Sequence, residues 1–323
     1  MSNPSRVMLV TGASGFLGTT IVGAAKEAGW RVRAFDRCPS KTADGIEQFV
    51  GDIGDAELLR KACKSVSVVL HAAGLAHVMG AAAKNAALFN TVNETGTKLV
   101  VEAAVECGVP HVVLVSSVSV YGEYMGALCD ESAPCKPKGP YAISKWRSEQ
   151  VAAEGMASGS GALTILRFAT MYGEGDRGNV ARLIRAIDRG HFLWLGTGEN
   201  RKSMLYKQDA ARACLAAAMK PARGIEIFNV SARPVPMREI VIAICQALGR
   251  PTPRYGIPRA LLNIAGQISS RIGDPLQLAR QVEKFLRDDA YDGSKFEAAY
   301  NFTPAISLAE GIHREVGSLQ SAK

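Results

Sequence analysis

The first half of the chain alternates short apolar segments with segments of helical periodicity, and this alternation limits the possible folds more than any other feature. The apolar segments predict strands at Val7–Thr11, Arg31–Asp36, Gln48–Gly51, Val66–His71, His111–Ser116 and Leu163–Phe168. Apolar residues at helical spacing predict helices at Phe16–Ala28, Asp55–Cys63, Ala86–Cys107 and Ala142–Glu154. Apolar strands separated by helices are typical of parallel sheets covered on both faces, so the sequence predicts an α/β fold with a doubly wound parallel sheet.

A glycine-rich turn follows the first predicted strand and opens the first predicted helix. Its sequence is Thr11-Gly12-Ala13-Ser14-Gly15-Phe16-Leu17-Gly18. Gly12 permits a tight turn, Gly15 lets the backbone approach a pyrophosphate, and Gly18 allows close packing of helix on strand. The N-terminus of the helix favours an anion. The spacing is GxxGxxG, which matches the dinucleotide-binding (Rossmann) pattern only in part, and a plain strand–turn–helix is the alternative.

Asp36, at the end of the second predicted strand, is the expected partner of a cofactor ribose. A carboxylate there accepts from a ribose 2′-hydroxyl and repels a 2′-phosphate, which favours NAD over NADP. The neighbouring Arg37 and Arg33 oppose this preference, because guanidinium groups suit a 2′-phosphate. Asp52, after the third predicted strand, is expected either to bind an adenine edge or to belong to a helix N-cap region.

Tyr141 and Lys145 lie four residues apart at the start of a predicted helix, so their side chains project from the same face. A phenol has a pKa near 10 in water, and an ammonium about 5 Å away at an effective dielectric of about 20 would lower this pKa by roughly 2 to 3. Such a phenol can act as a general base. Ser117, with Ser119 as the second choice, is expected to hydrogen-bond the reacting oxygen and complete a catalytic triad.

Composition and charge exclude several classes of function. The formal net charge of the 323 residues is +8, but Lys and Arg are spread along the chain, which argues against a nucleic-acid surface. A pocket for an anionic small molecule and a merely basic surface fit equally well. The 7 cysteines form no CxxC pair, so we expect reduced thiols, no metal site and a cytoplasmic protein. We expect no membrane span, and the amphipathic segment Ile257–Ile272 is expected to pack on the core rather than on a membrane.

The rhythm of the sequence changes after Phe168, where Gly and Pro become more frequent. We therefore expect residues 1–168 to form an NAD-binding domain and residues 169–323 to form mainly a smaller C-terminal α/β substrate-binding region. The apolar run Ile225–Val230 predicts a return to the sheet near residues 206–231.

At these residues the chain resembles the extended short-chain dehydrogenase/reductase family, within it the NAD-dependent epimerase/dehydratase group typified by UDP-galactose 4-epimerase. The resemblance covers nearly the whole length and rests on several ordered motifs. These are TGASGFLG, Asp36, GDIGD, His71-Ala72-Ala73-Gly74, Val92-Asn93-Glu94-Thr95-Gly96-Thr97, SSVSVYG, YAISK, Arg167 and Tyr172-Gly173.

The resemblance implies a site for NAD, and less readily for NADP. The residues expected to line it are Gly12, Gly15, Phe16, Leu17, Gly18, Asp36, Arg37, Asp52, Ile53, Ala72, Ala73, Gly74, Asn93, Ser116, Tyr141, Lys145 and Phe168. Ser117, Tyr141 and Lys145 would be the catalytic residues, and Lys145 would also hold the nicotinamide ribose.

The resemblance also implies a nucleotide-sugar substrate, held by the C-terminal region. The residues expected to contact it are His77, Ser117, Ser119, Asn179, Arg201 and Lys202. Relatives hold the diphosphate with an Arg where this chain has Lys202, and Lys cannot form the bidentate contact of Arg. The position that limits substrate size in relatives, three residues before Asp292-Gly293-Ser294-Lys295, holds Asp289.

Val118 and Ser119 follow Ser117, where dehydrating and decarboxylating relatives carry carboxylates. Elimination needs an acid and a base beyond the tyrosine, so C4 epimerisation and simple 4-keto reduction remain. A ketoreductase of an apolar alcohol or ketone is the alternative activity, and a dinucleotide-sensing protein without activity is disfavoured by the presence of Tyr141 and Lys145. The resemblance further implies a homodimer formed through Ala86–Cys107 and Ala142–Glu154.

Overall fold

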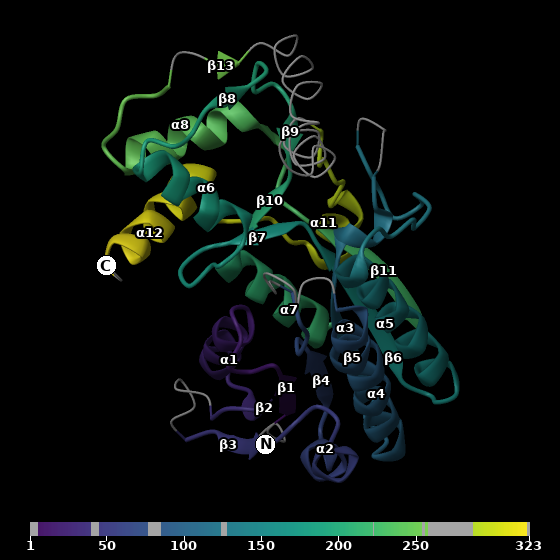
Figure 1. The fold of residues 1–323 in the computed structure, drawn as a ribbon. Helices are drawn as coiled ribbons and strands as arrows, with labels where there is room; N and C mark the ends of the chain where they lie inside the picture. The colour runs from purple at the N-terminus through teal and green to yellow at the C-terminus, as the bar shows by residue number, and fades with distance from the viewer. Residues whose placement is uncertain are drawn as a thin grey trace.

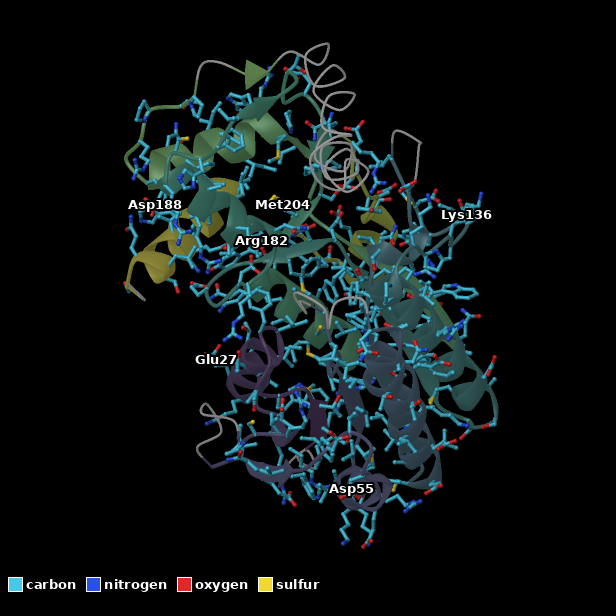
Figure 2. The ribbon with its side chains drawn as sticks, viewed as in Figure 1. Glu27, Asp55, Lys136, Arg182, Asp188 and Met204 are labelled. Carbon is cyan, nitrogen blue, oxygen red and sulfur yellow. The ribbon has the colours of Figure 1, made fainter. Side chains whose placement is uncertain are left out.

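One central parallel sheet, with helices on both faces, organises the chain (Figure 1). The computed structural model describes residues 6–39, 45–76, 85–123, 128–221, 223–253, 256–257 and 287–321. Figure 2 shows Asp55 and Asp188 near opposite ends of the molecule, with side chains filling the space between the layers. None of the helices in the described ranges is long and apolar enough to cross a membrane.

The central sheet contains seven strands, all parallel, in the order β11-β6-β5-β4-β1-β2-β3. Their bounds are β1 Val7–Thr11, β2 Arg31–Asp36, β3 Glu47–Val50, β4 Val68–His71, β5 His111–Ser117, β6 Ala162–Phe168 and β11 Ile225–Val230. The predicted doubly wound fold and its strands are confirmed, with small shifts at some ends. β1 and β4 are buried along their whole length, because both of their faces are covered.

The order of the strands reverses beside β1. The chain builds β1, β2 and β3 outward to one edge and then returns to place β4 on the other side of β1. Loops that leave the carboxyl ends of β1 and β4 therefore run in opposite directions and leave a crevice between them. Thr11 ends β1 and His71 ends β4, so the glycine-rich turn and the HAAG segment meet there.

Alternate residues of each strand supply two separate apolar layers. Met8 and Val10 of β1 face one layer, which includes α1 (Gly18–Glu27) and α7 (Lys207–Met219). Val7 and Leu9 face the other. The helices of that second layer are α2 Ala56–Cys63, α4 Gly96–Glu106 and α5 Pro140–Ala157. Thus α7, from the second half of the chain, covers the sheet of the first half.

The helix predicted at Ala86–Cys107 is interrupted in the structure. A short α3 (Ala86–Phe89) is followed by a π turn over Asn90–Thr95 and then by α4. The prediction of one continuous helix was wrong. A π turn contains one residue more than an α-helical turn, and the apolar residues on both sides keep helical spacing, so the sequence pattern does not reveal it. Such π turns occur frequently at functional sites.

A third apolar cluster forms the C-terminal region at the upper left of Figure 1. It lies among α6 (Asn179–Asp188), α8 (Met237–Ala247) and α12 (Leu308–Ser321). The remaining elements are the 3-10 helix Val118–Tyr121, β7 Thr170–Tyr172, β8 Trp194–Leu195, β9 Arg201–Lys202, β10 Met204–Tyr206, β12 Val235–Pro236, β13 Gly256–Ile257 and α11 Ser294–Tyr300. The predicted helix Ile257–Ile272 lies outside the described residues, apart from Ile257.

Candidate active site

The glycine-rich turn packs directly on the HAAG segment. Gly12 has a φ of +70°, and a Cβ at this position would lie 2.6 Å from the backbone nitrogen of Ala73. A Cβ on Gly18 would lie only 1.9 Å from the carbonyl oxygen of Gly12. A side chain at either position would displace the backbone, so the tight turn predicted at Gly12 is confirmed and Gly18 packs closely on that turn, whereas the contact of both glycines with a cofactor stays a prediction.

The N-terminus of α1 is suited to an anion. Leu17, at the N-cap, makes no side-chain cap, and the first turn carries no acidic residue. Gly15 is exposed, and the Phe16 ring lies 5.8 Å from the Lys207 Nζ, whereas the Leu17 side chain is buried in the core. The N–H groups and positive dipole of this helix end can therefore hold a phosphate group.

Asp36 is fixed beside the glycine-rich turn by backbone donors. Its Oδ2 accepts from the Ser14 backbone nitrogen at 2.9 Å, and its Oδ1 accepts from that of Cys38 at 3.4 Å. Arg33 is directed elsewhere, since its guanidinium donates to Glu47 and to the carbonyl oxygens of Ala62 and Lys64. Arg37 is exposed. Two arginines opposed a preference for NAD in the sequence. One of them, Arg33, is bound within the protein, so it does not offer its guanidinium to a 2′-phosphate.

Asp52 and Ile53 make local contacts. Asp52 is exposed, and its Oδ1 accepts from the Gly54 backbone nitrogen at 2.8 Å. Asp55, three residues on, caps α2 by accepting from the Leu58 backbone nitrogen. Ile53 is buried, and a Cβ on Gly96 would lie 2.8 Å from its Cγ2. The described contacts of Asp52 are those of the N-cap region, so a contact with adenine stays a prediction.

His71, at the end of β4, is buried between two threonine hydroxyls. Its Nδ1 lies 2.6 Å from the Thr11 Oγ1, and its Nε2 lies 2.9 Å from the Thr97 Oγ1. Thr97 donates its proton to the Asn93 carbonyl oxygen at 2.5 Å, so its oxygen accepts from Nε2 and leaves Nδ1 to accept from Thr11. Burial lowers the pKa of His71 to about 3, and the ring is neutral. This row of hydrogen bonds ties β1 and β4 to the π turn.

Asn93, in the π turn, clamps the HAAG segment to α5. Its Oδ1 accepts from the Leu75 backbone nitrogen at 2.7 Å, and its Nδ2 donates to the Leu75 carbonyl oxygen and to the Ser144 Oγ. Ser144 donates onward to the Tyr141 carbonyl oxygen at 2.9 Å. Both amide protons of Asn93 are used within the protein, so its side chain positions the neighbouring segments rather than offering donors to a cofactor.

Ser117, Tyr141 and Lys145 come together at the carboxyl end of β5. The Ser117 side chain, at the end of the strand, lies close enough to the Tyr141 hydroxyl on α5 to lower the pKa of that phenol. Lys145 is buried, and its Nζ donates to the Val115 carbonyl oxygen at 2.6 Å. A Cβ on Gly74 would lie 3.6 Å from the same Nζ, so the HAAG segment passes directly over the ammonium.

Burial controls the ionisation of Tyr141 and Lys145. It raises the pKa of Tyr141 above the usual value of a phenol, and the hydrogen bond with Ser117 only partly opposes this rise. Burial also lowers the pKa of Lys145 to about 8, against the attraction of Glu149. The net lowering of the Tyr141 pKa that was expected from Lys145 is therefore wrong for the polypeptide by itself, because loss of hydration raises this pKa by more than Ser117 lowers it.

Ser119 follows Ser117 in the 3-10 helix. Its backbone nitrogen donates to the Ser117 Oγ at 3.2 Å. Its own Oγ is buried and has no hydrogen-bond partner among the described residues. A buried hydroxyl without a partner costs about 1–3 kcal/mol, which a bound polar ligand can recover. Val118, between the two serines, is buried. Because its side chain is apolar, this position carries no acid or base.

The hydroxyl of Ser116, a residue expected at the cofactor, belongs to a buried ionic network. Its hydroxyl donates to the Glu149 Oε1 at 2.5 Å. Arg167 binds both oxygens of the same carboxylate, the shortest contact being 2.6 Å. Phe168 was also expected at the cofactor, but its ring is buried in the apolar core. The hydroxyl of Ser116 is committed to Glu149, so only its backbone is left for a cofactor.

The same network continues from Arg167 to the far strand of the sheet. Arg167 Nη1 donates to the Tyr121 hydroxyl at 2.9 Å, and that hydroxyl donates to the Asn229 Oδ1 at 2.7 Å. Burial opposes the charge of Arg167, but its hydrogen bonds with Glu149 raise its pKa. Glu149 was not identified from the sequence, although it lies four residues after Lys145 on the same helix face. The network therefore holds α5 against β5, β6 and β11.

The residues predicted to contact a substrate diphosphate make separate contacts within the protein. Lys202 is part-buried and pairs with Asp289, whereas Arg201 is exposed and donates to the Pro234 carbonyl oxygen at 2.7 Å. Successive side chains of a strand point to opposite faces, so Arg201 and Lys202 leave β9 on different sides, and a shared contact with a diphosphate stays a prediction. Asn179 is exposed and accepts from Arg182 at the start of α6. His77 lies outside the described residues.

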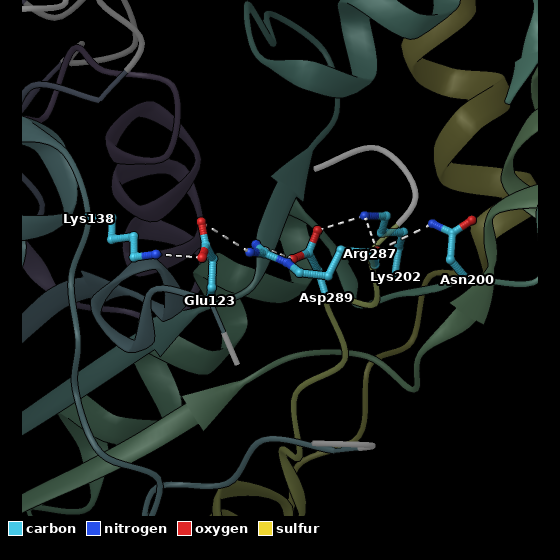
Figure 3. Close-up of polar contacts among 6 residues, drawn as sticks. All are labelled: Glu123, Lys138, Asn200, Lys202, Arg287 and Asp289. Atoms are coloured by element: carbon cyan, nitrogen blue, oxygen red, sulfur yellow. Dashed lines mark hydrogen bonds and ion pairs between the residues drawn. The ribbon is translucent and has the colours of Figure 1, made fainter. Parts of the chain in front are cut away.

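Arg287 pairs with the same carboxylate as Lys202, that of Asp289, and was not identified from the sequence. Its Nη2 lies 3.0 Å from the Asp289 Oδ1, while the Lys202 Nζ lies 2.7 Å from the Asp289 Oδ2 (Figure 3). The only sequence signal was a basic residue shortly before the D-x-S-K motif. The described residues contain no group of His, Cys, Asp or Glu side chains that could hold a metal ion.

Comparison with known proteins identifies a family and several relatives. The model of the NAD-dependent epimerase/dehydratase family matches residues 8–231. The chain is 30% identical over 315 residues to N-acetyl-alpha-D-glucosaminyl-diphospho-ditrans,octacis-undecaprenol 4-epimerase of Escherichia coli O157:H7, covering 95% of this chain and 93% of the relative. It is 29% identical over 327 residues to 2-alkyl-3-oxoalkanoate reductase of Stenotrophomonas maltophilia, covering 95% and 97%.

A solved structure shows the same architecture. MoeE5 in complex with UDP-glucose and NAD superposes with a TM-score of 0.77 at 29% sequence identity, over 98% of this chain and 99% of that chain. The similarity covers the sheet domain and the C-terminal region together.

Proposed function

Because this chain belongs to the NAD-dependent epimerase/dehydratase family, we propose that it is an NAD-dependent 4-epimerase acting on a UDP-hexose or UDP-N-acetylhexosamine. One observation carries the proposal: Ser117 ends β5 beside Tyr141 at the carboxyl end of the sheet, and the buried Lys145 lies one helical turn from Tyr141 and donates to β5. The related 4-epimerase from Escherichia coli and the nucleotide-sugar complex of MoeE5 support it.

The crevice between β1 and β4 has the features that NAD requires. The glycine-rich turn and the uncapped N-terminus of α1 would hold the pyrophosphate, and Asp36 would accept from the adenosine ribose. Lys145, beneath Gly74, would donate to the nicotinamide ribose. NAD supplies a hydride acceptor when bound, and the positive charge of its oxidised form would favour ionisation of Tyr141.

Proton transfer would be the work of Tyr141. Its phenolate would take the proton of the sugar 4-hydroxyl as the C4 hydride leaves, and Ser117 would donate a hydrogen bond to the same oxygen. After the ketone turns over, Tyr141 would return the proton as the hydride arrives on the opposite face of C4. Each turnover therefore restores both the phenolate and the oxidised cofactor, without an external reductant.

The surroundings of the triad favour epimerisation over elimination. Val118 is buried and Ser119 is neutral, so the residues after Ser117 supply no second acid or base. Lys202 and Arg287 would hold the diphosphate of the substrate from the C-terminal side. A homodimer through α4 and α5 stays a prediction.

Reduction of an apolar ketone is a second candidate function. Similarity to 2-alkyl-3-oxoalkanoate reductase over 95% of this chain supports it, because the same tyrosine could protonate any ketone beside the cofactor. The two functions differ in what happens to the cofactor: a reductase converts one reduced cofactor to the oxidised form in each turnover, whereas an epimerase begins and ends each turnover with the oxidised form.

The test combines cofactor identification with turnover. We expect the purified chain, once denatured, to release NAD(H), and the native chain to interconvert UDP-glucose and UDP-galactose, or the corresponding UDP-N-acetylhexosamines, without added reductant. Tyr141→Phe should lower the rate by about 10²- to 10⁴-fold, while the ring keeps its contact with Phe89.

Three results would count against the proposal. Turnover that requires stoichiometric NADH and gives a single alcohol would favour a 4-ketoreductase. Reduction of a long-chain 3-ketone together with no response to UDP-sugars would favour the second candidate. Full activity of Tyr141→Phe would exclude the proposed proton transfer altogether.

A further inference from the structure

Asp289 holds two cations from distant parts of the chain on a single carboxylate. Its Oδ2 lies 2.7 Å from the Lys202 Nζ, and its Oδ1 lies 3.0 Å from the Arg287 Nη2 (Figure 3). All three side chains are part-buried, with exposed fractions of 15% for Lys202, 24% for Asp289 and 22% for Arg287. Bulk water therefore screens these pairs less than it screens surface ion pairs.

The backbone fixes Asp289 beside Lys202. The Asp289 nitrogen donates to the Arg201 carbonyl oxygen at 2.9 Å, and the Ser203 nitrogen donates to the Asp289 carbonyl oxygen at 2.8 Å. The Arg287 carbonyl oxygen accepts from the Lys202 Nζ at 2.7 Å and from the Asn200 Nδ2 at 3.4 Å. The carboxylate is thus built into the site, and a backbone shift would have to break this short ladder to remove it.

The group lies at the active edge of the sheet. Arg287 Nη1 is 4.0 Å from the Glu123 Oε1, and Glu123 pairs with Lys138 (Figure 3). Glu123 follows Tyr121, whose ring stacks on that of Tyr291 with centroids 6.1 Å apart. The segment after Ser117 and the segment around Asp289 are therefore in direct contact, and an anion held there would lie on the substrate side of the triad.

The charges of this group nearly cancel. Lys138, Lys202 and Arg287 carry three positive charges, and Glu123 and Asp289 carry two negative ones, which leaves a net charge of +1. A diphosphate must compete with Asp289 for the same N–H donors and also meets its negative charge. Coulomb repulsion between the carboxylate and a doubly charged diphosphate a few ångströms away weakens binding on the order of tenfold.

We propose that Asp289 is a specificity-determining residue: an internal carboxylate that competes with the substrate diphosphate for Lys202 and Arg287 and thereby lowers the affinity of the site for free nucleoside diphosphates. Selectivity then depends on the sugar, since the diphosphate alone contributes less. This inference rests on the proposed function only in that Lys202 and Arg287 contact the diphosphate.

Calorimetric titration with UDP tests the inference without any turnover. Asp289→Asn keeps the shape of the side chain and one acceptor oxygen but removes the charge. We expect its Kd for UDP to be on the order of tenfold lower than that of the wild type at low salt, and the difference to shrink at high salt. Asp288→Asn is the matched control, because Asp288 accepts from the Arg201 backbone nitrogen rather than from either cation. Its Kd should stay within about twofold of the wild type.

A double variant separates charge from disturbed folding. In Lys202→Gln/Asp289→Asn the local net charge returns to +1, so the affinity for UDP should return to within about threefold of the wild type. Unchanged or weaker UDP binding by Asp289→Asn, equal gains from Asp288→Asn, or a gain that persists in the double variant would each overturn the inference. Absence of UDP binding in both wild type and Asp289→Asn would also overturn it, while the proposed function would still be decided by Tyr141-dependent turnover.

Discussion

The Lys145 ammonium donates to the carbonyl oxygen of Val115 at 2.6 Å, so α5 is tied to β5 of the central sheet by a buried charge. Burial lowers the pKa of Lys145 to about 8 because the charged form loses its hydration. The buried ammonium of Lys145 therefore destabilises the folded state. It lies beside the residues that would bind the cofactor.

Replacing Lys145 by Met is expected to stabilise the protein and abolish its activity. Since the folded pKa lies below the unfolded value of about 10.4, the folded state at pH 7 carries a penalty that Met lacks. We expect the free energy of unfolding at pH 7 to rise by about 1–3 kcal/mol. The gain should narrow between pH 8 and about pH 10.4, where the wild-type lysine becomes neutral in both states. Denaturant unfolding at several pH values measures it, and a gain that grows above pH 8 would contradict the assignment.

Asp36→Asn should weaken the preference for NAD. The carboxylate, held by the Ser14 nitrogen, repels a 2′-phosphate, so its removal should lower the ratio of the Kd for NADP to that for NAD on the order of tenfold. Fluorescence titration with both reduced cofactors gives this ratio. Asp52→Asn removes the same charge from an exposed turn, and a similar change there would show that Asp36 has no special role.

Thr97→Val should destabilise the fold. The variant keeps the shape of the side chain but leaves the His71 Nε2 without an acceptor and the Asn93 carbonyl oxygen without this donor. We expect a loss of about 1–3 kcal/mol in the free energy of unfolding. Thr91→Val is the control, because Thr91 is exposed and donates only to the nearby Ala87 carbonyl oxygen among its described side-chain bonds. Equal losses in the two variants would mean that the His71 row contributes nothing specific.

Glu149→Gln should be among the most damaging single substitutions in the sheet domain. It leaves the Arg167 guanidinium buried without its counter-charge, and an unpaired buried charge costs about 3–5 kcal/mol. Glu106→Gln breaks the exposed pair with Arg60 and should cost less than about 1 kcal/mol. Thermal unfolding of both variants gives the comparison, and losses of similar size would rule out a stabilising role for the buried network.

Glu315→Gln should stabilise the protein at alkaline pH. Glu315 on α12 is 1% exposed, and burial, together with the charge of Asp176, raises its pKa to about 8. Because the folded pKa exceeds the unfolded value of about 4.3, the wild type loses stability as pH rises from about 4.3 to 8. We expect the variant to be more stable by about 2–4 kcal/mol at pH 8 and equal near pH 4.

The control for this prediction lies on the same helix. Glu310→Gln removes an exposed carboxylate that pairs with Arg314, so its effect should stay within about 0.5 kcal/mol at every pH. A Glu315→Gln variant whose stability follows the wild-type pH dependence in parallel would show that this carboxyl titrates normally.

Local features of the sequence were sufficient to predict the sheet and much of the site. The strands follow from continuous apolar runs, and Ile225–Val230 was placed in the sheet as the structure has it. The need for glycine at positions 12 and 18 was predicted correctly because it depends on backbone geometry within one turn. The continuous helix through Asn93 was predicted wrongly, since a π turn leaves the flanking apolar spacing intact.

Sequence by itself determined which residues share a strand or a helix face, because periods of 2 and 3.6 residues are local properties of the backbone. It therefore placed Tyr141 and Lys145 together. Only the tertiary structure decided that Lys145 bonds to Val115, that burial raises the pKa of Tyr141, and that Asp289 pairs with Lys202 across the fold. These outcomes depend on hydration lost and on partners brought from distant parts of the chain, and neither is encoded in the spacing of neighbouring residues.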